Sequence, residues 1–203
     1  MWTNQSDRLI LASASPRRLQ LLEQIHVPVE QLVVPADGED EPRLSGERVT
    51  DYVTRTARDK LIRTQHYWRE QHPSQPLPPM LAADTTVAMG QTILGKPLDE
   101  MDAKRILTEL AGKTHDVYTA VVLSHDGQLH EALAHARVEM DTLTEPEIDH
   151  YVASGEPFGK AGAYGIQGIA AAYVKNIEGS YSAVVGLPLF ETAQLLKRAG
   201  LYV

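Results

Sequence analysis

The chain of 203 residues contains no cysteine. Disulfide bonds, zinc sites built on thiolates and a cysteine nucleophile are therefore excluded, and the composition fits a reducing compartment. Long apolar runs are also missing, because no stretch approaches the roughly 18 apolar residues that span a bilayer. The first seven residues are polar, and the apolar run Leu9–Ala14 is too short for a signal peptide. We therefore expect a cytoplasmic protein without a membrane segment.

Positive charge is scarce, because 19 Lys and Arg stand against 27 Asp and Glu, a formal net charge of -8. A field of that sign repels nucleic acid and anionic membranes, so neither is expected as a partner. The eight histidines show no H-x-x-x-H or similar spacing, so they are assigned no metal. A phosphorylated small molecule remains compatible with this composition, provided that the cations gather locally.

The hydrophobic residues, 43% of the chain, suffice for a full core, and we expect a single domain over residues 1–203. Apolar patterns predict strands near residues 8–13, 29–34, 80–89, 117–124, 129–140 and 172–177. They predict helices near 16–25, 47–69, 99–110, 144–154 and 188–198. Asp126-Gly127 is a strong hairpin signal, and Thr144 with Glu147 has the spacing of a capping box. The fold class is therefore α/β with a mixed sheet and flanking helices.

The segment Ser13-Ala-Ser15-Pro16-Arg17-Arg18 stands where the first strand meets the first helix. Ser15 suits the N-cap and Pro16 the first helical position. Each arginine beside the positive end of the helix dipole costs about 0.3–1 kcal/mol, and a bound anion would offset that cost. The alternative is that both arginines point into solvent, and the segment alone leaves the two interpretations even. No G-K-[ST] follows, so this is not a Walker A loop.

Asp84 ends an apolar strand, a position that aspartate seldom takes. Lys96 lies one hairpin away and is a candidate partner in a structural ion pair, the more common role for such an aspartate. The functional alternative is a metal ligand or general base, because open α/β sheets place their sites at strand ends.

The glycine-rich stretch 156–168 is the third informative segment. Repeated glycine lets a backbone approach a ligand closely. Lys160 adds a point charge, and Gln167 adds an amide that can read a base edge. A merely flexible loop more often contains Ser, Asn and Asp than this mixture of Ala, Tyr and Ile.

Taken together and in order, these segments resemble the Maf family of nucleotide pyrophosphatases. The matching segments extend over almost the whole chain: 13–18, 52–60, 83–85, 95–97, 112–119, 156–168, 179–181 and 184–188. The resemblance implies an inosine-triphosphatase-like α/β fold with two lobes around a cleft, commonly as a homodimer. It also implies hydrolysis of a nucleoside triphosphate between the α and β phosphates, aided by Mg²⁺ or Mn²⁺.

The resemblance also implies the site residues. Asp84 is the proton acceptor and a metal ligand, and Glu41 assists at the metal. The substrate contacts implied in this chain are Ser13, Arg17, Arg18, Lys60, Thr85, Lys96, Lys160 and Gln167. Arg17, Thr85 and Gln167 stand at the positions that distinguish the dTTP/UTP branch from the branch that prefers 7-methyl-GTP. One departure is visible, since Gly159 replaces an aspartate that usually precedes the lysine equivalent to Lys160.

The sequence therefore predicts a pyrophosphatase that converts dTTP and UTP, and modified pyrimidine nucleotides, to the monophosphate, a housecleaning role for the nucleotide pool. Two alternatives stay open at this point. One is a pyrophosphatase for 7-methyl-GTP or other modified nucleotides. The other is a non-catalytic, nucleotide-binding regulator of cell division. The replacement of the usual aspartate by Gly159 is compatible with this alternative.

Overall fold

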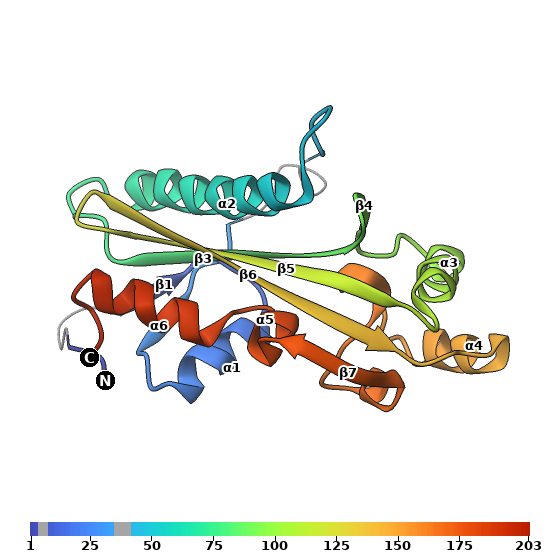
Figure 1. Ribbon diagram of the computed structural model, residues 1–203. Coiled ribbons are helices and arrows are strands. Elements are labelled where there is room, and N and C mark those ends of the chain that lie inside the picture. Colours follow the sequence, from blue (N-terminus) through green and yellow to red (C-terminus); the bar gives the residue numbers. More distant parts are fainter. Residues whose placement is uncertain (4–7, 35–41) are drawn as a thin grey trace.

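A long, twisted mixed sheet forms the centre of the molecule in the computed structural model, which describes residues 1–3, 8–34 and 42–203 (Figure 1). Its strands are β1 (Leu9–Leu11), β2 (Val29–Gln31), β3 (Met80–Met89), β4 (Thr92–Leu94), β5 (Thr114–His125), β6 (Gln128–Met140) and β7 (Val174–Gly179). Within the described residues their order is β2-β1-β3-β5-β6-β7, and β4 pairs with β3. The β1 pairings are parallel and the remaining ones antiparallel, so the predicted mixed α/β class is confirmed.

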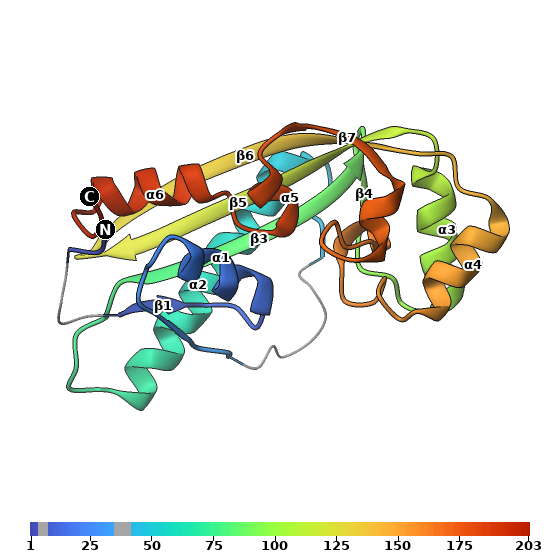
Figure 2. The ribbon, with the colours of Figure 1, turned by 90° about the horizontal axis from the view of Figure 1, so that it is seen from below.

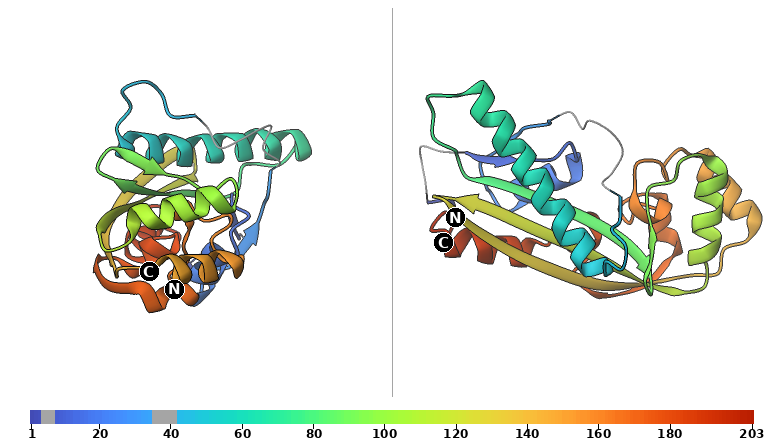
Figure 3. Two further views of the ribbon diagram at one scale, coloured as in Figure 1. Left: turned by 90° about the vertical axis from the view of Figure 1, so that its right-hand side faces the viewer. Right: turned by 90° about the horizontal axis from the view of Figure 1, so that it is seen from above.

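Helices cover both faces of this sheet. The α-helices are α1 (Pro16–Gln24), α2 (Val49–Gln71), α3 (Glu100–Leu110), α4 (Glu145–Ala153), α5 (Tyr181–Val185) and α6 (Leu189–Arg198). Helix α2 runs obliquely across one face, whereas α1, α5 and α6 lie on the other (Figures 1 and 3). Helices α3 and α4 stand at the end of the sheet remote from both termini (Figure 2). None of the helices described is long and apolar enough to cross a membrane.

Two short helices, η1 (Ala161–Ala163) and η2 (Ile169–Tyr173), fold the glycine-rich stretch against the end that holds α3 and α4 (Figure 2). The close approach depends on Gly162, whose φ is +73°. A Cβ atom on Gly162 would stand only 2.9 Å from Cγ1 of Val87 on β3. The amide of Gly162 also donates to the carbonyl of Gly95 at 3.0 Å. Gly162 therefore docks this segment onto the β3–β4 hairpin.

Local signals in the sequence predicted most of these boundaries. Asp126 and Gly127 both have positive φ, as a two-residue type I′ hairpin requires. Thr144 and Glu147 form the predicted capping box at α4. Three predictions were wrong in detail: β2 ends at Gln31, residues 169–173 form η2 before β7, and α5 was missed. Helix α5 has only five residues, too few for a helical period to show in the sequence.

The position of the cleft follows from how β3 is paired. On one side β5 accompanies β3 from Met80 to Ala88. On the other side β1 reaches only Met80 and Leu81, and β4 begins at Val87. Residues 82–86 thus have no partner strand on that edge among the described parts of the chain. A side chain on either face of β3 can reach the gap.

Candidate functional site

A cleft of about 1080 Å³ opens at this gap. The α1 junction, α2, β3, β4 and the glycine-rich stretch all contribute to its walls. Nearly every residue that the sequence singled out lines it: Ser13, Arg17, Arg18, Lys60, Asp84, Thr85, Lys96, Lys160 and Gln167. Glu41, the remaining candidate, lies outside the described residues. Residues separated by more than 150 positions in the chain therefore share one site.

Arg18 is held in the cleft by three hydrogen bonds. Its Nε donates to the carbonyl of Gly186 at 2.8 Å, one terminal nitrogen to Oγ of Ser13 at 3.1 Å, and the other to Oγ1 of Thr85 at 3.2 Å. Of the five N–H donors of a guanidinium, two remain for a ligand among the described contacts. The pKa of Arg18 lies below its ordinary value. Burial is the main cause, the charge of Arg17 adds to it, and the charge of Asp84 acts in the opposite direction.

Positive side chains outnumber carboxylates on the described walls of the cleft. The pKa of Lys160 is lowered by burial and then by the positive charge of Arg17, and the charge of Glu156 offsets only part of this. Arg17 has no hydrogen bond or ion pair with any described residue, although it lines the cleft. Like charges that are brought together repel one another, so an anionic ligand would stabilise the arrangement. The structure supports the anion site, one of the two interpretations of the Ser13–Arg18 segment.

Asp84 was expected at the end of a strand but lies in the middle of β3, where the missing partner strand on one edge leaves it open to the cleft, and it projects toward α2. Its Oδ1 accepts an ion-paired hydrogen bond from Nζ of Lys60, and its Oδ2 accepts from Oγ1 of Thr56 at 2.9 Å. These two donors stand one helical turn apart, so one face of α2 contacts both carboxylate oxygens. The sequence offered Lys96 as the ion-pair partner of Asp84, but the structure shows Lys60 in that role. Sequence reasoning missed Thr56, because nothing local indicates which turn of α2 faces β3.

Thr85 approaches the cleft from the opposite face of the same strand. Asp84 lies on the face packed against α2, whereas Thr85 lies on the face that carries α1 and α5. Its Oγ1 accepts from Arg18 and lies 3.1 Å from Oγ1 of Thr119, which in turn donates to the carbonyl of Ala183. Thr85 therefore links β3 to α1 through Arg18, and to α5 through Thr119.

Glu156 shapes the glycine-rich wall. Its carboxylate accepts from the hydroxyl of Tyr151 at 2.8 Å and from the amides of Ile169 at 2.8 Å and Ala170 at 3.3 Å. Burial alone raises the pKa of Glu156, but these hydrogen bonds outweigh it, and the pKa lies below its ordinary value. A Cβ atom on Gly168 would stand 2.1 Å from Oε2 of Glu156, so a larger residue there would displace this carboxylate from its hydrogen bonds. Glu156 thus has a structural role, because it connects α4 to the start of η2. Its place in the sequence motif did not reveal this role.

Gln167 is exposed, and none of the described residues forms a hydrogen bond with its amide. An amide can swap its donor and acceptor ends by turning over, so it distinguishes two base edges only when a neighbouring group holds it in one orientation. Thr85 contacts Arg18 and Thr119, so it does not hold Gln167. The amide of Gln167 is free to turn toward a ligand.

The donor set in the cleft suits a hard divalent cation that is shared with phosphate. Two carboxylates line the described walls. That of Glu156 already accepts hydrogen bonds from Tyr151, Ile169 and Ala170, so Asp84 is the better candidate for a metal ligand. No group of three or more metal-binding side chains occurs among the described residues. Mg²⁺ is commonly held by one or two carboxylates together with substrate phosphates. Gly159, with φ of +72° and open space beside it, contributes no ligand at the position of the expected aspartate.

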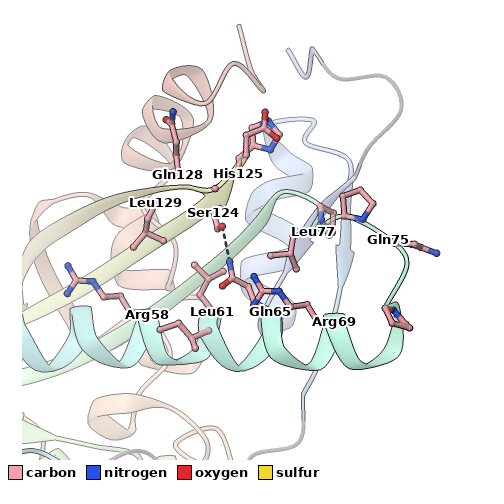
Figure 4. A pocket seen from close by; sticks show the side chains of 16 residues that line it. Arg58, Leu61, Gln65, Arg69, Gln75, Leu77, Ser124, His125, Gln128 and Leu129 are labelled. Carbon is pink, nitrogen blue, oxygen red and sulfur yellow. Dashed lines mark hydrogen bonds and ion pairs between the residues drawn. The ribbon is translucent and has the colours of Figure 1, made fainter.

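A second hollow, of about 750 Å³, lies between the later turns of α2, the proline-rich connection and the β5–β6 hairpin. Leu61 and Gln65 point from α2 toward the hairpin, and Gln65 donates to Oγ of Ser124 at 2.8 Å (Figure 4). Arg58 in this hollow is neutralised by its ion pair with Glu131. Its described walls hold none of the substrate or metal contacts that the family resemblance implied, so the cleft at β3 is the candidate site.

Comparison with known proteins gives a consistent result. The sequence profile described as "Maf-like protein" matches residues 8–199. A Bordetella avium (strain 197N) protein named dTTP/UTP pyrophosphatase is 55% identical over 195 residues, 96% of this chain and 96% of that protein. Proteins of the same name from Cupriavidus metallidurans and Dechloromonas aromatica are 48% and 46% identical, each over 98% of its own length and 96% and 95% of this chain.

Proposed function

The chain belongs to the Maf family, and from this premise we propose that it hydrolyses dTTP and UTP to the nucleoside monophosphate and pyrophosphate. The observation that carries the proposal is the cleft itself, in which the Asp84 carboxylate stands among positive side chains. The cations that line the described walls are Arg17, Arg18, Lys60, Arg63, Lys96 and Lys160. A protein whose net charge is -8 thus gathers its positive charge where a triphosphate of about -4 would lie.

The cleft residues divide the reaction between binding and proton transfer. Hydrolysis requires water to attack the α phosphorus while the bond to the β phosphate breaks. Asp84 orients that water and accepts its proton, because it lines the cleft and its carboxylate is positioned by Lys60 and Thr56. Arg18 and its neighbouring cations hold the phosphates and stabilise the departing pyrophosphate. When bound, Mg²⁺ or Mn²⁺ supplies positive charge that offsets the phosphates, and Asp84 with Glu41 would hold it.

The products and the metal requirement test this proposal directly. With dTTP as substrate we expect pyrophosphate and thymidine monophosphate, measured by anion-exchange chromatography of quenched samples. In excess chelator the rate should fall more than ~10-fold, equivalent to about 1.4 kcal/mol of barrier, and recover when Mg²⁺ or Mn²⁺ is added. Orthophosphate as the first product would contradict the proposal, since it means attack at the γ phosphate. A full rate in chelator would contradict the metal requirement but leave the proposed reaction intact.

Base selectivity is expected from Gln167. Uracil and thymine present an acceptor, a donor and an acceptor along one edge, whereas cytosine reverses two of these. The Gln167 amide matches the first pattern alone when backbone groups around the bound base hold it in one orientation. We expect kcat/KM for dTTP and UTP to exceed that for CTP and the purine triphosphates by at least ~10-fold, because mispaired polar groups lose water without gaining partners. Gln167→Glu should lose much of this preference, since an ionised carboxylate cannot donate.

The matched control is Gln128→Glu, which adds the same charge at an exposed position on the β5–β6 hairpin. It should keep the wild-type preference across the nucleotide panel. Comparable efficiency on GTP or 7-methyl-GTP would exclude the dTTP/UTP branch and leave the pyrophosphatase chemistry intact.

The proposal also includes a cytoplasmic homodimer, which rests on the family resemblance. Light scattering after size-exclusion chromatography measures the mass directly, and a species of 22.4 kDa would contradict the dimer.

A further inference from the structure

Thr56 lines the cleft from α2, and its hydroxyl is almost completely buried, with 4% of the residue exposed. Its Oγ1 lies 2.9 Å from Oδ2 of Asp84, 3.0 Å from the carbonyl of Val53 and 3.1 Å from the carbonyl of Tyr52. A hydroxyl has one hydrogen to donate, so three acceptors compete for it.

The carboxylate is the acceptor that receives this hydrogen. The two carbonyls lie in the helix, where they also accept backbone amides, whereas Asp84 carries a full charge that makes its hydrogen bonds stronger. If the hydrogen pointed to a carbonyl, lone pairs of Thr56 and Asp84 would face each other at 2.9 Å. Thr54 on the same helix shows the ordinary alternative, donating to the carbonyl of Thr50 at 2.8 Å.

Lys60 and Thr56 then respond differently to a triphosphate. Lys60 is a cation on the wall of the cleft, and phosphate oxygens compete with Oδ1 of Asp84 for its three N–H donors. Thr56 is neutral and buried, so phosphate does not draw it away. We propose that Thr56 is a positioning residue, which holds the carboxylate of Asp84 in the orientation for proton transfer while Lys60 engages the substrate. This inference rests on the proposed pyrophosphatase function.

The test separates orientation of Asp84 from substrate binding and from folding. Thr56→Val keeps the shape of the side chain and removes the hydroxyl. We expect kcat for dTTP to fall about 10-fold, as for the loss of one hydrogen bond to a charged group, with KM changed less than about two-fold. Thr56→Ser restores the donor and should recover at least half of kcat. Thr54→Val, the matched control, removes a hydroxyl of the same helix away from the cleft and should leave kcat unchanged.

Two further measurements do not depend on turnover. Calorimetric binding of a non-hydrolysable dUTP analogue with a methylene bridge between the α and β phosphates should be equal for the wild type and Thr56→Val. A crystal structure of Thr56→Val with this analogue should show the Asp84 carboxylate rotated from its position in the wild-type complex. Should Thr56→Val fail to fold, Thr56→Cys, a weaker donor of similar size, takes its place with the same expected loss.

Equal kcat for Thr56→Val and Thr54→Val would overturn the positioning role. A raised KM with unchanged kcat would also overturn it, because Thr56 would then contribute only to binding. Failure of the wild-type chain to release pyrophosphate from any nucleoside triphosphate would instead overturn the proposed function, so the two failures are distinguishable.

Discussion

Replacing Asp84 with asparagine is expected to lower kcat by ~10²–10⁴-fold, the usual effect of losing a general base. The fold should survive, because an amide can take the place of the carboxylate. Its oxygen can accept from Lys60, and its NH₂ can donate to Oγ1 of Thr56 once that hydroxyl turns to a helix carbonyl. The free energy of unfolding should therefore change little, and nucleotide binding should remain measurable.

The measurement is single-turnover hydrolysis of dTTP, together with thermal unfolding of both proteins. Asp149→Asn serves as the control, because Asp149 forms an exposed ion pair with Lys104 away from the cleft and should retain full activity. Retention of more than about a tenth of kcat by Asp84→Asn, only ~1.4 kcal/mol of barrier, would make Asp84 a structural residue.

Loss of Arg18 should have the second largest effect. Arg18→Ala is expected to lower kcat/KM by at least ~100-fold, since charge-assisted hydrogen bonds contribute about 1.5–3 kcal/mol each and two donors of Arg18 are not used by described residues. The substitution also leaves Ser13, Thr85 and the carbonyl of Gly186 without a shared donor. Both kcat and KM should therefore worsen, because the phosphate contact and the alignment of β3 with α1 are lost together.

Arg18→Lys distinguishes charge from geometry. Lysine keeps the charge but cannot make three divergent hydrogen bonds and still present a planar fork to phosphate, so only a small part of kcat/KM should return. Arg105→Ala, an exposed arginine on α3, is the control and should behave as the wild type. Equal activity of Arg18→Lys and the wild type would mean that charge alone matters at this position.

Short-range signals made several elements predictable from the sequence. The hairpin at Asp126-Gly127 and the capping box at Thr144 follow from backbone and hydrogen-bond preferences that act within four residues. In the segment Ser13 to Arg18, two arginines stand beside the positive end of a helix dipole, where positive charge is unfavourable. This conflict indicated an anion site. The gathering of distant candidates in one cleft was expected from the family resemblance, and the structure places nine of them there.

The partners of those residues were less predictable. The sequence offered Lys96 as the cation for Asp84, because a hairpin brings nearby residues together, but the structure provides Lys60 from α2. Glu156 could equally have faced a ligand, and only the fold of the glycine-rich segment turns it onto the amides of Ile169 and Ala170. The angle at which a long helix crosses a sheet depends on the packing of all side chains between them.

By itself, the sequence determined the absence of thiol chemistry, the α/β class and the set of polar residues from which a site could be built. These are matters of composition and of preferences within a few residues. Only the tertiary structure decided that β1 ends after two pairs with β3, which opens an edge where Asp84 and Thr85 reach one cleft from opposite faces. It also decided that Thr56 meets Asp84 across 28 positions of the chain. Such contacts depend on how whole elements pack, and no local pattern in the chain encodes that packing.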